Sequence, residues 1–299
     1  MHSEWYTFRM KKLRLNVFGK ANLSLNITGK KDRLHTLDSV MMSVDAFDTV
    51  TVCERNDDKI EVTFDTPGID KVNNTAYKAA KLVCDKIGRG VDIQIEKGIP
   101  VGAGLGGSSA DGAAVIRALD LFYGLSSHGI DVRKTALSVG SDVPFMLTGG
   151  LAQVTAMGEE MLFIENKLKL FAVGLMTETV STAEAYALFD TLHPTMEYLP
   201  TETDKFVNLL LDGDIKALEY MDNALFEASA KLAPSIKTNF DKLKAAGAIP
   251  CMTGSGGMVL GYYTDIDAFA RAALSFKTEK GFRVFSSAPT GILHEWIER

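Results

Sequence analysis

The alternation of apolar and polar residues in the first third of the chain predicts β-strands. Between residues 13 and 28, apolar residues occupy every second position, with a break at Gly19 and Lys20. A period of two is typical of strands that have one buried face. The same period returns in four shorter segments and predicts strands over 40–44, 49–53, 60–64 and 91–96.

Other segments carry apolar residues three and four positions apart, which predicts helices. The first such helix covers 73–87: Asn73, Asn74 and Thr75 can each cap its start, and Gly88 ends it. Further helices are predicted over 109–123, 131–139, 182–189, 203–211, 215–221, 235–246 and 266–275. Strands are predicted over 168–176, 257–263 and 282–286, the last as an edge or closing strand.

Helices and strands are thus mixed in both halves of the chain, which predicts an α+β fold. The length of 299 residues is that of one large domain or two ordinary ones. We expect two α+β domains, residues 1–160 and 161–299. The sequence contains no internal repeat and no low-complexity segment.

Composition and charge narrow the class of protein. The 32 basic and 38 acidic residues give a net charge of −6, which argues against a nucleic-acid or anionic-membrane partner. The three cysteines, Cys53, Cys84 and Cys251, are far apart, which fits a reducing compartment and disfavours a zinc site. Residues 1–15 lack the apolar core of a signal peptide, and no apolar run reaches the roughly 20 residues of a membrane span. We therefore expect a cytoplasmic protein, monomeric or homodimeric.

A glycine-rich loop carries the clearest chemical signal. In the segment 99–109, Gly102, Gly104, Gly106 and Gly107 allow tight turns and a close approach of the backbone to a ligand. The serines at 108 and 109 then open an apolar helix, whose first N–H groups attract anions. The loop is no Walker A motif, because no Gly-Lys-Ser/Thr follows, and it fits a dinucleotide fingerprint poorly. It predicts a phosphate site, the alternative being a plain glycine turn before a core helix.

Five motifs in register resemble the GHMP kinases. They are the loop itself, Gly19–Leu25, Asn73–Ala80, Gly140–Phe145 and Met252–Gly257. Within that superfamily, the chain is most similar to the 4-diphosphocytidyl-2-C-methyl-D-erythritol kinase family of the non-mevalonate isoprenoid pathway. The resemblance implies a ribosomal S5 domain 2-like N-terminal domain and a ferredoxin-like C-terminal domain. It also implies an ATP-dependent kinase that uses Mg²⁺ and phosphorylates a hydroxyl of a small molecule, with the active site between the domains.

The resemblance also implies roles for individual residues. Asp142 is the expected base for the acceptor hydroxyl, and Lys20 the expected lysine beside it. Considered alone, Asp142 could equally be a helix cap and Lys20 a solvated lysine at a strand end. The expected nucleotide contacts are Pro100, Gly102, Ala103, Gly104, Leu105, Gly106, Gly107, Ser108, Ser109 and Ala110, with Ser109 also a Mg²⁺ ligand. The expected acceptor contacts are Asn22, His35, Thr182, Tyr186, Thr253, Gly254, Ser255 and Gly256.

The acceptor end departs from the family pattern. Where the family has Gly-Tyr-His, this chain reads Arg33-Leu34-His35, so His35 is kept and Leu34 replaces the tyrosine. Tyr186, four residues after Thr182, is the aromatic residue that could stack on a cytosine. Three alternatives follow: an erythritol kinase with a variant pocket, a paralogue acting on another alcohol such as a polyol, homoserine, mevalonate or a sugar, or a binding protein without catalysis.

Overall fold

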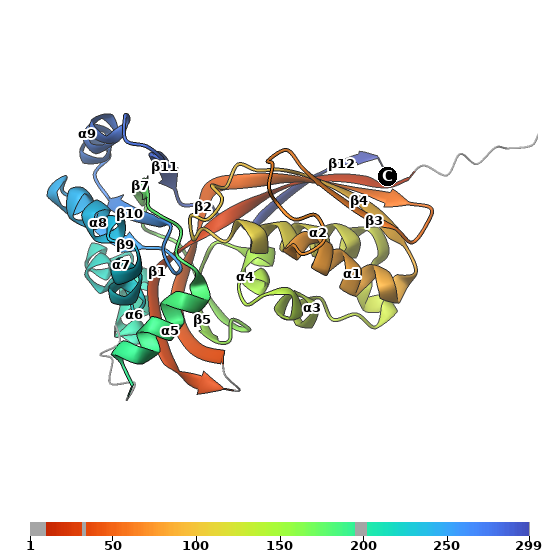
Figure 1. The fold of residues 1–299 in the computed structure, drawn as a ribbon, viewed down its shortest axis with the longest axis horizontal. Coiled ribbons are helices and arrows are strands. Elements are labelled where there is room, and N and C mark those ends of the chain that lie inside the picture. The colour runs from red at the N-terminus through yellow and green to blue at the C-terminus, as the bar shows by residue number, and fades with distance from the viewer. Residues whose placement is uncertain (1–9, 32–33, 195–201, 299) are drawn as a thin grey trace, which may run out of the picture.

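In the computed structural model, residues 10–31, 34–194 and 202–298 are described, and their strands form two sheets (Figure 1). The larger sheet has the order β12-β1-β2-β4-β3, with β5 and β6 continuing from β2 and the short β8 beside β1. Its strands are β1 (Lys12–Lys31), β2 (Leu34–Arg55), β3 (Ile60–Phe64), β4 (Gly90–Glu96), β5 (Leu151–Ala156), β6 (Glu160–Ile164), β8 (Asp222–Asn223) and β12 (Ile292–Glu298).

Four helices cover one face of this sheet, as Figure 1 shows: α1 (Thr75–Ile87), α2 (Gly107–Tyr123), α3 (Val132–Val139) and α4 (Val143–Thr148). Asn74 caps α1 by accepting a hydrogen bond from the Tyr77 amide, and Gly88 ends it in the left-handed conformation. The central helix α2 is buried around most of its circumference, which fits its nearly continuous apolar sequence.

The second sheet has the order β11-β7-β10-β9 and is antiparallel throughout. Its strands are β7 (Phe171–Met176), β9 (Ile249–Met252), β10 (Met258–Tyr263) and β11 (Arg283–Ser286). In chain order this is 4-1-3-2, with helices after the first and third strands, which is the split βαβ arrangement of ferredoxin-like domains. Helices α5 (Thr182–Leu192), α7 (Phe226–Leu232), α8 (Ser235–Ala245) and α9 (Ile266–Phe276) share the core of this sheet. Helix α6 (Thr203–Asp212) packs instead against β2 and β6 of the larger sheet. The predicted α+β fold is confirmed, and β11 lies at a sheet edge as expected.

The long hairpin of β1 and β2 links the two sheets. In the first half of β1, buried Leu13, Leu15 and Val17 alternate with more exposed residues, because helices cover only one face. From Gly19 to Ile27 every residue is buried, because the strand passes between the two hydrophobic cores. The interruption of the alternation at Gly19 and Lys20 coincides with a register shift between Phe18 and Gly19, through which the strand continues. The last strand, β12, returns to the first sheet beside β1.

Candidate active site

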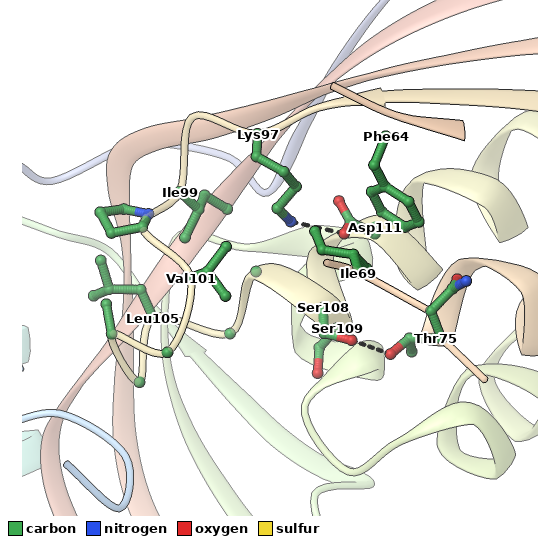
Figure 2. Close-up of a pocket in the computed structure, with 17 residues that line it drawn as sticks. Phe64, Ile69, Thr75, Lys97, Ile99, Val101, Leu105, Ser108, Ser109 and Asp111 are labelled. Carbon is green, nitrogen blue, oxygen red and sulfur yellow. Dashed lines mark hydrogen bonds and ion pairs between the residues drawn. The ribbon is translucent and has the colours of Figure 1, made fainter. Parts of the chain in front are cut away.

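The glycine-rich loop joins β4 to α2 and curves around a cavity of about 300 Å³ (Figure 2). Gly102, Gly104 and Gly106 have φ of 75°, 73° and 73°, a region that favours glycine. The first amide groups of α2 therefore face the cavity without helical partners. Thr75, at the start of α1, hydrogen-bonds with Ser108, so two helix N-termini meet at this cavity. Such a site attracts a polyphosphate.

The rest of the cavity wall is apolar. Phe64 and Ile69 lie across the cavity from the loop residues Ile99, Val101 and Leu105 (Figure 2). An apolar slot next to an anion-binding loop fits a nucleotide, because its planar base needs apolar contacts and its phosphates need N–H donors. All ten residues expected to contact the nucleotide lie in this loop or at the start of α2.

A buried ionic network that the sequence analysis missed lies at the end of the cavity. Lys97 Nζ is 2.5 Å from Asp48 Oδ2 and 2.7 Å from Asp111 Oδ2. Asp48 also accepts hydrogen bonds from the amides of Gly98 and Ile99, both 2.8 Å long, whereas Asp111 Oδ1 has no partner among the described residues. One ammonium balances only one carboxylate. Burial raises the pKa of Asp111 to about 8, although the charge of Lys97 acts against this rise.

This network predicts a pH-dependent stability. Because the folded-state pKa of Asp111 lies above its unfolded value of 3.8, the native state binds more protons than the unfolded state between those values. We expect Asp111 to lower the free energy of unfolding as the pH rises toward 8, by up to about 1.4 kcal/mol per pH unit. Urea unfolding of wild type and Asp111→Asn between pH 5 and 8 measures it, and the variant should have the flatter profile. Equal slopes would contradict the assignment; Asp241→Asn, in an exposed ion pair with Lys237, is the control.

Lys20 and Asp142 meet beside the loop. Lys20 Nζ is 3.5 Å from Asp142 Oδ2, and the Lys20 side chain is only 4% exposed. The Lys20 amide donates to the Leu105 carbonyl over 2.9 Å, so β1 and the loop are joined at this residue. Asp142 occupies the N-cap position of α4, but its side chain makes no capping hydrogen bond. The carboxylate instead forms an ion pair with the lysine, next to the glycine-rich loop.

Asn22 connects this pair to the second sheet. Its side-chain Oδ1 accepts hydrogen bonds from Lys20 Nζ over 2.6 Å and from the Gly254 backbone amide over 3.0 Å. The backbone amide of Asn22 donates to Thr253 Oγ1 over 3.2 Å. Thr253 Oγ1 in turn donates to the Gly104 carbonyl over 3.1 Å. The turn 253–257, between β9 and β10, therefore packs directly against the glycine-rich loop.

This seam between turn and loop is very tight. A Cβ atom on Gly257 would lie 1.8 Å from the Gly102 carbonyl oxygen, and one on Gly104 would lie 2.4 Å from the Thr253 carbonyl oxygen. Both contacts are with backbone, which cannot move aside as a side chain can. Only glycine fits at either position.

The expected acceptor contacts on α5 lie on one side of that helix. Thr182 Oγ1 hydrogen-bonds with Ser255 Oγ over 2.9 Å. The Tyr186 ring stacks on His35, with 4.5 Å between the ring centroids. Burial, and secondarily the charge of Asp142, raises the pKa of Tyr186. His35 also contacts Asp190 on α5, a residue that the sequence analysis missed. Of the altered stretch, Asp32 and Arg33 lie outside the described residues, and Leu34 is 61% exposed.

The described residues contain neither a cluster of metal-binding side chains nor a membrane-spanning helix. Over 10–31, 34–194 and 202–298, no three His, Cys, Asp or Glu side chains are grouped so that they could hold a metal ion. In the same ranges, no helix has the length and apolar character needed to cross a membrane.

The family, sequence and structure comparisons with known proteins all find small-molecule kinases. Residues 74–152 match the family described as GHMP kinases N terminal domain. A 4-diphosphocytidyl-2-C-methyl-D-erythritol kinase of Alkaliphilus metalliredigens is 33% identical over 261 residues, which are 85% of this chain and 89% of the relative. A crystal structure of 4-(cytidine 5'-diphospho)-2C-methyl-D-erythritol kinase has a TM-score of 0.75 and 26% identity, covering 92% of this chain and 99% of that one. A homoserine kinase from Cytophaga hutchinsonii shares the fold, with a TM-score of 0.72 and 17% identity over 99% of this chain and 100% of that one.

Proposed function

The chain belongs to the 4-diphosphocytidyl-2-C-methyl-D-erythritol kinase family of the GHMP kinases. We therefore propose that it transfers the γ-phosphoryl group of ATP to a hydroxyl of 4-diphosphocytidyl-2-C-methyl-D-erythritol. The reaction is a step of non-mevalonate isoprenoid precursor biosynthesis. The family resemblance based on five motifs is confirmed by a relative that matches 85% of the chain. The observation that carries the proposal is the contact of Lys20 with Asp142, 3.5 Å apart next to the loop of a cavity built for phosphates.

ATP binds in the cavity of the glycine-rich loop. The base lies in the apolar part near Phe64 and Ile69, and the phosphates lie against the loop amides and the start of α2. Phosphoryl transfer needs mainly positioning and charge stabilisation, which a rigid ring of N–H donors supplies. The γ-phosphoryl group then points toward Lys20, whose amide is bonded to Leu105 of the loop.

The acceptor hydroxyl is activated by Asp142. A carboxylate can take the hydroxyl proton as the oxygen attacks phosphorus. Lys20 stabilises the ionised form of Asp142 and the negative charge that gathers on the transferred group. Asn22 holds the Lys20 ammonium from the other side over 2.6 Å, which keeps the ammonium between the two substrates.

Mg²⁺ fits this site as a companion of the nucleotide. Mg²⁺ keeps several waters and binds through phosphates with one or two protein oxygens, so it does not require a cage of acidic residues. The hydroxyl of Ser109, which lines the cavity, is the protein ligand that we propose. Bound there, the ion would neutralise phosphate charge.

The nucleotide end of the acceptor lies between the hairpin and α5. His35 and Tyr186, whose rings stack on each other, offer aromatic and polar contacts for a cytosine. Thr182, one helical turn before Tyr186, hydrogen-bonds with Ser255 of the turn 253–257. The turn residues Thr253, Gly254, Ser255 and Gly256, with Asn22, border the path from these rings to Lys20.

An acceptor panel tests the function. Purified protein with Mg-ATP should phosphorylate 4-diphosphocytidyl-2-C-methyl-D-erythritol with a kcat/KM at least about a hundredfold above that for homoserine or mevalonate, because those acceptors lack the cytidine. ADP release and the mass of the product measure this. Higher activity with another alcohol would favour the paralogue, and no ADP release with any acceptor would favour a binding protein without catalysis.

A further inference from the structure

One face of α5 carries a row of polar and aromatic side chains toward the hairpin. Thr182, Tyr186 and Asp190 are spaced four apart, so they lie above one another on the helix. Thr182 binds the turn at Ser255, and Tyr186 stacks on His35. Asp190 ends the row, and nothing in the reaction proposed above uses it.

Asp190 is shared by two residues of the hairpin. His35 Nε2 lies 2.8 Å from Asp190 Oδ1, and Lys30 Nζ lies 2.6 Å from Asp190 Oδ2. Lys30 and His35 are direct cross-strand neighbours on β1 and β2. The carboxylate therefore joins both sides of the hairpin to α5.

The His35 ring is fixed on three sides. Tyr186 stacks on its face at 4.5 Å with an interplanar angle of 26°, and Phe189 meets it edge-on at 6.5 Å and 84°. Asp190 holds its Nε2 edge. The side chain is only 12% exposed, so its orientation is set before any ligand arrives.

The contact with Asp190 determines which ring nitrogen carries the proton. A carboxylate only accepts hydrogen bonds, so Nε2 must be the N–H donor. Lys30 Nζ lies 2.6 Å from the other oxygen of the same carboxylate, so each Asp190 oxygen receives one donor. In a neutral imidazole whose proton is on Nε2, the lone pair is on Nδ1, and Nδ1 has no hydrogen-bond partner among the described residues.

We infer that Asp190 is a positioning residue which makes His35 Nδ1 a hydrogen-bond acceptor and thereby selects an acceptor substrate with an exocyclic amino group on its base. Cytosine carries an amino group at position 4, where uracil carries a carbonyl oxygen. A lone pair on Nδ1 attracts the first and repels the second. This inference rests on the proposed function and explains how the same site rejects the uridine counterpart of the substrate.

Asp190→Asn tests the inference, because the amide can donate to Nε2 and move the ring proton to Nδ1. Wild type should prefer the cytidine compound over its uridine counterpart by at least about a hundredfold in kcat/KM. In the variant, KM for the cytidine compound should rise about tenfold and the preference should fall to within about tenfold, with kcat within about twofold. Asp241→Asn, which alters an exposed ion pair on α8, is the matched control and should change nothing.

Four outcomes would overturn the inference. If Asp190→Asn keeps the full preference for cytidine, or loses kcat with both compounds equally, Asp190 only braces the fold, and the proposed kinase function stands. If wild type phosphorylates neither compound, the function fails and the inference with it. ¹⁵N NMR of the wild-type His35 ring, assigned with His35→Gln, does not depend on the variant's folding: a protonated Nδ1 beside a bare Nε2 would contradict the assigned tautomer.

Discussion

Asp142→Asn is expected to lower kcat by about a thousandfold, the middle of the range for loss of a general base. Asparagine has the same shape, and Asp142 makes no capping hydrogen bond to α4, so the fold should be unaffected. The nucleotide cavity does not include this residue, so the Kd for ATP should stay within about threefold. Steady-state kinetics and calorimetric titration with a non-hydrolysable ATP analogue measure the two quantities.

Asp85→Asn is the matched control for this variant. Asp85 is 59% exposed in an ion pair with Lys81 on α1, so its loss of charge should leave kcat unchanged. A kcat within about tenfold of wild type in Asp142→Asn would mean that another group, or the transferred phosphate itself, takes the proton. A large loss of ATP affinity would instead show that Asp142 acts at the nucleotide.

Lys20→Met is expected to reduce kcat by about a thousandfold as well, with little change in the Kd for ATP. Methionine has a similar length and suits a position that is 4% exposed, so the variant isolates the loss of charge. Without the ammonium, none of the described residues places a cation within 4 Å of the Asp142 carboxylate, and the charge on the transferred phosphoryl group loses its counter-ion. The kcat and the Kd for ATP are measured as for Asp142→Asn.

The double variant sharpens this prediction. Two residues that act as one unit are strongly non-additive, so Lys20→Met combined with Asp142→Asn should be hardly slower than either single variant. Multiplying losses would show that the two residues act independently and would contradict the proposed pair. Lys81→Met, which removes an exposed lysine from α1, is the control.

Local chemistry allowed much of the fold to be predicted from the sequence. The helix predicted over 73–87 is α1, because an asparagine cap and a glycine stop enclose a clear apolar face. The strand predicted over 91–96 is β4 with one further residue. Helix α4 was missed because its six residues are too short to show a period. The helix predicted over 215–221 is a 3₁₀ helix, Ile215–Tyr220, whose tighter turns apolar spacing alone does not distinguish.

The strands of the larger sheet that the sequence did not predict are stabilised by partners far away in the chain. Strand β12 is mostly exposed, and among the described strands its partner is β1, so its own sequence carries little signal. The division of the chain at residue 160 stays a prediction. The structure adds that β8 and β12, both after that point, belong to the sheet of the first half.

The residues of the candidate site also divide into those that the sequence predicted and those that it did not. Lys20 and Asp142 could be predicted because motifs mark them, and the structure has them 3.5 Å apart; their roles remain proposals. Lys97 was missed because a single lysine after a strand resembles any surface lysine, and its two carboxylate partners come from β2 and α2. Asp190 could have been predicted from the sequence, because it follows Tyr186 by four residues and so lies on the same helix face.

The seam between the glycine-rich loop and the turn 253–257 has a consequence for how this enzyme can change its substrate. Since a hydrogen atom is all that fits at Gly104 and Gly257, the ATP end offers no room for variation from either half of the chain. The tip of the hairpin and the outer turns of α5 are looser: Leu34 is 61% exposed, and Asp190 retains 32%. New acceptors are therefore to be sought by altering that rim, with the phosphate-handling parts carried over intact.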